Sequence, residues 1–180
     1  MRRAIFSFLR EITIFFTLAI LVSFVINEMR SSTPLDTRLP LTELSLEPVI
    51  SLKKNGSDSS FYLDHKPKVT LVYLWGTWCS ICSLVSPMIS ELATERKDLR
   101  IISIVVSSGS EERIQQYLSK ESLKFSVIND LHNRWRSFFN TQVFPSIYLY
   151  HQEGELKGVE TGYISKLGLM IRLWWVSNID

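Results

Sequence analysis

Cysteine is scarce in this sequence, which contains two among 180 residues, Cys79 and Cys82. So few cysteines exclude a scaffold stapled by several disulfides, which much smaller domains need because their cores are small. Histidine is scarce as well: the three present are not paired at metal-ligand spacing, so no four-ligand zinc site is expected. Ser83 stands directly after the second cysteine, where covalent haem attachment of the c type requires histidine.

An excess of one charge sign is also missing, since 20 basic residues face 18 acidic ones. The small surplus lies within the first 33 residues, and the remainder is neutral. No basic stripe interleaved with aromatic residues is present, so nucleic acid is not expected as a partner. The sequence also lacks internal repeats and low-complexity tracts, and its 46% hydrophobic content is ordinary for a folded protein.

Only one long hydrophobic stretch is present, at residues 4–26, and it is interrupted only by Arg10 and Glu11. A membrane-spanning helix needs ~20 mostly apolar residues. The stretch therefore predicts a single anchor in a bacterial inner membrane, with Arg2 and Arg3 keeping the N-terminus in the cytoplasm. A cleaved signal peptide is the alternative. Both export the rest of the chain to the periplasm, where disulfides persist.

The chain divides into three parts by this pattern. Residues 1–30 are the predicted transmembrane anchor, residues 31–45 contain two prolines and no sustained period and predict a linker, and residues 46–180 form the domain. Strands are expected at residues 69–75, 101–106, 124–128, 146–150 and 156–161, with a further hairpin around Asn55 and Gly56. Helices are expected at residues 79–98, from Ser110 onward, at 131–139 and at 165–175. This alternation predicts an α/β domain with a mixed sheet flanked by helices.

The two cysteines lie where the first long helix follows a buried strand. In the first helical turn, the sulfur of Cys79 meets N–H groups without intrahelical partners and the positive end of the helix dipole, which favour the reactive thiolate. Cys82 lies one turn further, within disulfide reach. The spacing predicts a two-step exchange in which Cys79 attacks a partner disulfide and Cys82 resolves the mixed disulfide. A structural bridge is the alternative, but it would close too short a loop to constrain the unfolded chain much.

Three segments carry a resemblance to thioredoxin-fold proteins. LVYLWGTWCSICSLVSP resembles their active-site strand, W-x-x-W-C-x-x-C motif and helix proline. TQVFPSIYLY resembles the loop with their cis-proline, and GELKGVETGY the hairpin after it. With the N-terminal anchor, the chain resembles the TlpA-like branch, especially its membrane-anchored disulfide oxidoreductases of the suppressor-for-copper-sensitivity type. The resemblance implies a thioredoxin-like fold, no cofactor besides a redox-active disulfide, protein thiols or disulfides as partners, and a membrane electron-transfer protein as redox partner.

The same resemblance assigns roles to individual residues. Cys79 is the expected nucleophile and Cys82 the resolving thiol. Pro145 is the expected cis-proline facing the pair, and the backbone around Phe144 is expected to pair with an extended substrate segment. Phe144 is bulkier than the threonine expected before this proline.

Several residues near the cysteine pair depart from the family pattern. Trp78, Ser80 and Ile81 are expected to contact the substrate. Tyr73 occupies the position of the buried carboxylate of thioredoxins. Ser80 and Ile81 lie between the cysteines, where related proteins often have a proline and where the dipeptide helps to set redox potential. Trp75 is expected in the core, whereas Trp78 is expected to be partly exposed beside the substrate.

Two other functions remain open at this point. One is a dedicated thiol reductant of cytochrome c maturation, and the other is a non-catalytic periplasmic protein whose two thiolates hold Cu(I). At the C-terminus, at least one of Trp174 and Trp175 is expected to pack on the sheet, with contact to the bilayer as the alternative.

Overall fold

The computed structural model describes residues 10–18, 21–22, 34, 36–45, 47–50, 67–96 and 98–178. The chain forms two compact units, Met1–Ser31 and Ser32–Asp180. The hairpin expected around Asn55 and Gly56 lies outside the described residues.

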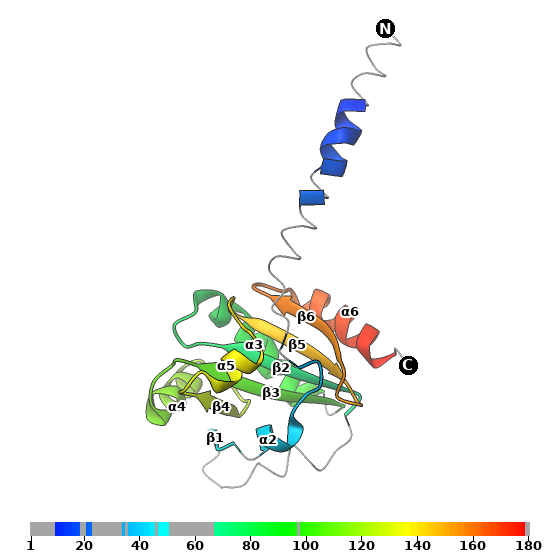
Figure 1. Ribbon diagram of the computed structural model, residues 1–180. Helices are drawn as coiled ribbons and strands as arrows, with labels where there is room; N and C mark the ends of the chain where they lie inside the picture. Colours follow the sequence, from blue (N-terminus) through cyan, green and yellow to red (C-terminus); the bar gives the residue numbers. More distant parts are fainter. Residues whose placement is uncertain are drawn as a thin grey trace. The chain divides into compact units, whose positions relative to one another are not determined.

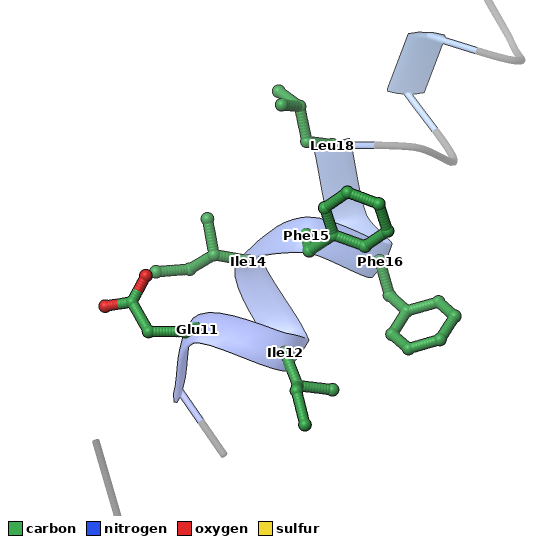
Figure 2. Close-up of a pocket in the computed structure, with 6 residues that line it drawn as sticks. All are labelled: Glu11, Ile12, Ile14, Phe15, Phe16 and Leu18. Carbon is green, nitrogen blue, oxygen red and sulfur yellow. The ribbon is translucent and has the colours of Figure 1, made fainter. Parts of the chain in front are cut away.

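In the first unit, residues 10–18 are helical. A shallow surface pocket is lined there by apolar side chains and by Glu11. The side chains point away from the helix in several directions (Figure 2). Phe15 is 69% exposed and Phe16 61%. Within the described ranges, no helix combines the length and hydrophobicity that a membrane crossing demands. Much of the predicted anchor at residues 4–26 lies outside those ranges.

The second unit is built on one six-stranded sheet in the order β1-β4-β3-β2-β5-β6 (Figure 1). The strands are β1 Val49–Ile50, β2 Val69–Trp75, β3 Leu99–Val106, β4 Val127–Asp130, β5 Ser146–His151 and β6 Leu156–Thr161. β3 runs parallel to β2 and β4, and the remaining pairs are antiparallel. The prediction of a mixed sheet is thus confirmed.

The two central strands, β2 and β3, are buried along their whole length. Their sequences are almost continuously apolar, as expected for strands that helices cover on both faces. Trp75 at the end of β2 pairs in register with Val105. The carboxyl ends of both strands therefore lie at the same edge of the sheet, where functional loops of open α/β sheets gather.

Helices cover both faces of the sheet (Figure 1). They are α2 Leu41–Ser45, α3 Ser80–Glu95, α4 Glu111–Lys120, α5 Arg134–Phe138 and α6 Lys166–Ser177. Buried side chains of α3, α4 and α6 join one core cluster, and those of α2 and α5 join the other. The predicted flanking of the sheet by helices is confirmed.

The C-terminal helix corrects one expectation. α6 buries Leu169, Leu173 and Val176, which are spaced four and three residues apart and form its inward stripe. Trp174 and Trp175 lie outside this stripe and are 67% and 52% exposed. The expectation that at least one of these tryptophans packs on the sheet is therefore wrong.

The strand expected at residues 124–128 starts later, at Val127. The backbone N–H of Lys124 donates to the Ser90 hydroxyl of α3 at 2.8 Å, instead of pairing with a strand. Phe125 belongs to the core cluster that also contains the buried side chains of α3. The chain thus packs against a helix before it enters the sheet.

Candidate active site

The cysteine pair lies where α3 leaves the end of β2. Cys79 is the N-cap of α3, one position before the helix proper, and its sulfur accepts a hydrogen bond from the backbone N–H of Cys82 at 3.1 Å. This N–H belongs to the first turn, so it has no intrahelical partner. The predicted contact between the Cys79 sulfur and an unshared amide is therefore present.

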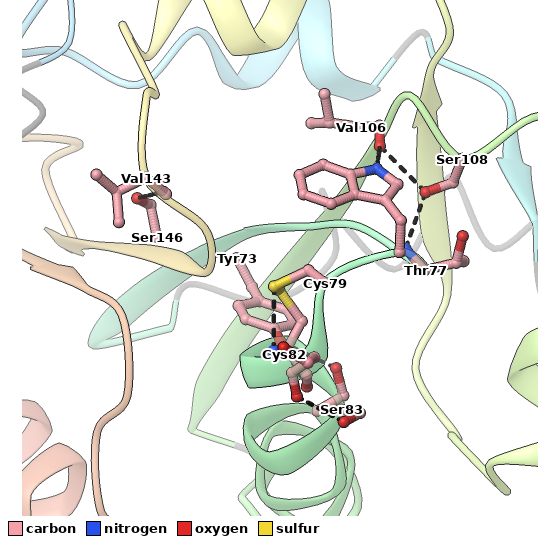
Figure 3. Close-up of a disulfide and its surroundings, with 12 residues drawn as sticks. Tyr73, Thr77, Cys79, Cys82, Ser83, Val106, Ser108, Val143 and Ser146 are labelled. Carbon is pink, nitrogen blue, oxygen red and sulfur yellow. Dashed lines mark hydrogen bonds between the residues drawn. A yellow bond between two sulfur atoms is a disulfide. The ribbon is translucent and has the colours of Figure 1, made fainter.

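Cys79 and Cys82 form a disulfide, with Cα atoms 5.2 Å apart (Figure 3). The two cysteines differ in access: Cys79 is 8% exposed, whereas Cys82 is fully buried. A partner molecule can therefore approach Cys79 but not Cys82.

Trp78 is held beside the pair by its indole N–H, which donates to the carbonyl of Val106 at 3.1 Å. The side chain is 56% exposed, and Trp75 is fully buried, as predicted for both. The indole lies directly over Gly76, where an added Cβ would come within 2.5 Å of the ring. Only glycine fits beneath this orientation of Trp78.

Ser108 fixes the backbone of the same loop from the end of β3. Its hydroxyl accepts from the N–H of Thr77 at 3.0 Å and donates to the carbonyl of Val106 at 3.1 Å (Figure 3). Ser108 is fully enclosed at 3% exposure. Sequence reasoning missed this residue, although its place just after a strand parallel to β2 was a usable signal.

The second loop of the site carries the peptide bond between Phe144 and Pro145, which is cis as the resemblance implied. The carbonyl of Pro145 accepts from the N–H of Gly162 at 2.8 Å, and the Ser146 hydroxyl donates to the carbonyl of Val143 at 2.7 Å. The first bond ties the loop to the residue that follows β6, and the second closes the loop on itself.

An aromatic contact joins the two loops. The rings of Trp78 and Phe144 meet edge to face, with centroids 5.3 Å apart. Ser80 is exposed and Ile81 is 41% exposed on the first turn of α3. The structure therefore brings Trp78 and Phe144 together, and leaves Ser80 and Ile81 open to solvent next to Cys79.

Tyr73 lies beneath the pair, fully buried on β2. Its hydroxyl shares a hydrogen bond of 2.9 Å with Ser86 and lies 3.5 Å from the carbonyl oxygen of Cys82. Burial raises the pKa of Tyr73 above its ordinary value, against the opposing effect of the Ser86 hydrogen bond. Two neutral hydroxyls therefore occupy the region in which a thioredoxin carries its buried carboxylate.

A mixed sheet of this order, with a cysteine pair at the start of the helix after a central strand, defines the class of thioredoxin-like proteins. The chain belongs to the AhpC/TSA family, whose characteristic sequence pattern matches residues 45–159.

Two relatives carry informative names. A "thioredoxin-like protein" of Haemophilus influenzae is 37% identical over 108 residues, which cover 60% of this chain and 63% of the relative. The "thiol-disulfide oxidoreductase ResA" of Geobacillus kaustophilus is 25% identical over 104 residues, covering 57% and 60%. The chain thus spans about three fifths of the length of these relatives.

Solved structures share the fold. A secreted disulfide oxidoreductase of Mycobacterium tuberculosis, described as homologous to DsbE of Escherichia coli, superimposes with a TM-score of 0.58 at 19% identity, covering 74% of this chain and 98% of that one. A thiol:disulfide interchange protein of Chlorobium tepidum gives 0.59 at 17% identity, covering 82% and 98%.

Proposed function

We propose that this protein is a thiol-disulfide oxidoreductase that exchanges dithiol for disulfide with protein partners through Cys79 and Cys82. The observation that carries the proposal is the disulfide at the start of α3, in which Cys79 retains 8% exposure and Cys82 is fully buried. The hydrogen bond from the Cys82 N–H is oriented to stabilise negative charge on that sulfur. The names of the relatives from Haemophilus and Geobacillus support the same activity.

In the reducing direction, the Cys79 thiolate attacks one sulfur of a partner disulfide. A mixed disulfide forms, and the other partner sulfur leaves as a thiolate that takes a proton from solvent. Cys82 then loses its proton and attacks the Cys79 sulfur, which releases the second partner thiolate. The partner gains two electrons, and the Cys79–Cys82 pair loses them. In the oxidising direction, every step is reversed.

The surroundings of Cys79 would hold the partner segment during these steps. Pro145 would face the cysteine pair, and the backbone around Phe144 would pair with an extended segment. Trp78, Ser80 and Ile81 offer exposed surface beside the sulfur for its side chains.

We further infer a membrane-anchored, periplasmic protein of the ScsD-like type, held by residues 4–26. The exposed apolar side chains around residues 10–18 support this placement, because a helix that is apolar on all sides suits a membrane interior. A membrane electron-transfer protein would then reset the redox state of the pair.

Trapping of mixed disulfides tests the activity. In a Cys82→Ser variant, the attack by Cys79 still occurs but resolution does not, so disulfide-linked partner adducts should accumulate. Cys79→Ser is the matched control and should trap nothing. Equal trapping by both variants would contradict the assignment of Cys79 as nucleophile.

The identity of the captured partners separates the finer alternatives. Capture restricted to cytochrome c maturation proteins would replace the ScsD-like assignment. Stoichiometric copper in reduced wild-type protein, with no adducts in Cys82→Ser, would favour a metal-binding protein instead.

A further inference from the structure

The segments that build the site carry no charged residue. This holds for residues 69–90 with the cysteine pair, 103–110 from within β3 into the loop after it, 137–150 with Pro145, and 161–165 from the last residue of β6 onward. A single charge beside such a surface has no neighbouring protein charge to offset it. Its attraction for an opposite charge on a bound partner can therefore distinguish one partner from another.

Arg136 of α5 is a charged side chain that contacts one of these uncharged segments, the loop that carries Phe144 and Pro145. Its guanidinium carbon lies 5.9 Å from the centroid of the Phe144 ring, within the range of cation–π contacts. Its Nε donates to the carbonyl of Thr141 at 3.3 Å, which ties the side chain to the loop that carries Pro145. Arg136 itself remains exposed.

Arg136 has no carboxylate at ion-pair distance among the residues that the structure describes. The nearby Asp130 carboxylate is buried and accepts the backbone N–H groups of Trp135 and Arg136. Arg134, two residues earlier, differs because it forms ion pairs with Glu43 and Glu47. The positive charge of Arg136 is thus available to a partner.

We propose that Arg136, with the Trp78–Phe144 pair, selects protein segments in which an acidic residue lies close to the reactive cysteine. The aromatic pair offers an apolar contact to the segment, and the guanidinium offers a charge-assisted hydrogen bond to a carboxylate. The occupant is therefore an extended, cysteine-bearing segment with an aspartate or glutamate near the cysteine. The inference rests on the proposed function and defines its substrate class.

Two peptides that differ only in aspartate or asparagine beside one cysteine test this. Each cysteine is linked to a neutral 2-thiopyridyl group, whose release reports attack by Cys79 of the reduced, full-length protein. At low ionic strength, the aspartate peptide should react about 1.4- to five-fold faster, the range of an exposed ion pair. Added salt should reduce this ratio toward one.

Variants identify the residue responsible. Arg136→Gln should bring the ratio to about one, and Arg136→Glu should make the asparagine peptide the faster one. Arg134→Gln is the matched control and should leave the ratio unchanged, because its charge is already paired. Equal rates for both peptides with wild-type protein, or a ratio that survives Arg136→Gln, would overturn the inference.

Two further measurements distinguish a failure of the Arg136 inference from a damaged site and from a failure of the proposed function. All proteins are also assayed with neutral dithiodipyridine, for which Arg136→Gln should match wild type if its site is intact. A Cys79→Ser variant that reacts as fast as wild type in that assay would reject the proposed function itself. The salt dependence of the wild-type ratio tests the charge effect without any substitution.

Discussion

At the scale of single residues, Gly76 determines where Trp78 lies. The indole occupies the space that any side chain at position 76 would need. Its N–H is bound to the carbonyl of Val106, and its ring contacts Phe144. One glycine without a positive φ therefore fixes the aromatic surface beside Cys79.

Gly76→Ala should displace the indole, since the new Cβ would lie 2.5 Å from the ring. We expect a loss of about 1–3 kcal/mol in the free energy of unfolding, measured by urea titration, with a change in tryptophan fluorescence. Gly158→Ala is the control, because its Cβ would meet only a Leu149 carbon at 3.9 Å. Equal effects of both substitutions would contradict this account of Gly76.

Tyr73 makes stability sensitive to alkaline pH. Burial raises its pKa in the folded state above the ordinary value, so the unfolded chain releases this proton first as pH rises. Its contribution is fully present below about pH 10 and is lost as pH rises further.

Tyr73→Phe should therefore flatten the fall in the free energy of unfolding above about pH 10, as measured by denaturant titrations across the alkaline range. Ser86→Ala, which retains Tyr73 and removes its hydrogen-bond partner, should keep the steep fall. If the free energy of unfolding falls as steeply with pH in Tyr73→Phe as in wild type, ionisation of Tyr73 does not cause the fall.

The sequence identified the residues of the site that lie within one motif. Cys79, Cys82 and Trp78 belong to a single segment, so spacing was sufficient to place them. Ser108 and Arg136 reach the same region from other loops and helices. Their contacts depend on how the sheet orders its strands, which no local pattern encodes.

At the scale of whole elements, the central strands could be predicted from the sequence because both of their faces are buried. β2 spans residues 69–75 as predicted, because an uninterrupted apolar run has few other stable arrangements. The predicted start of β4 was wrong. The Lys124 N–H binds the Ser90 hydroxyl of α3, and Phe125 packs in the core, so these residues do not join the sheet. Such tertiary contacts override local preference.

α6 provides an element-scale prediction from two adjacent residues. Leu173→Ala removes a side chain that is 1% exposed and should cost about 2–5 kcal/mol of unfolding free energy. Trp174→Ala removes a side chain that is 67% exposed and should change that value by less than about 0.5 kcal/mol. Denaturant titration of both variants checks this difference, and a larger loss for Trp174→Ala would place its indole in the core.

At the scale of the whole molecule, the proposed location gives a prediction about the full chain. The apolar residues 4–26 should keep the protein in the inner-membrane fraction after an alkaline carbonate wash. Protease added to spheroplasts should digest the domain, which lies outside the inner membrane in this proposal. Recovery of the intact chain in the soluble fraction would contradict the anchor.

The central claim concerns the chemistry of one sulfur, and limited alkylation of the reduced protein tests it most directly. Sub-stoichiometric iodoacetamide is applied from about pH 5 to about pH 9, on either side of ordinary thiol ionisation, and mass spectrometry identifies the labelled cysteine. The account predicts that Cys79 is labelled first and ionises at lower pH than glutathione. Preferential labelling of Cys82, or a Cys79 that ionises no more readily than glutathione, would contradict it.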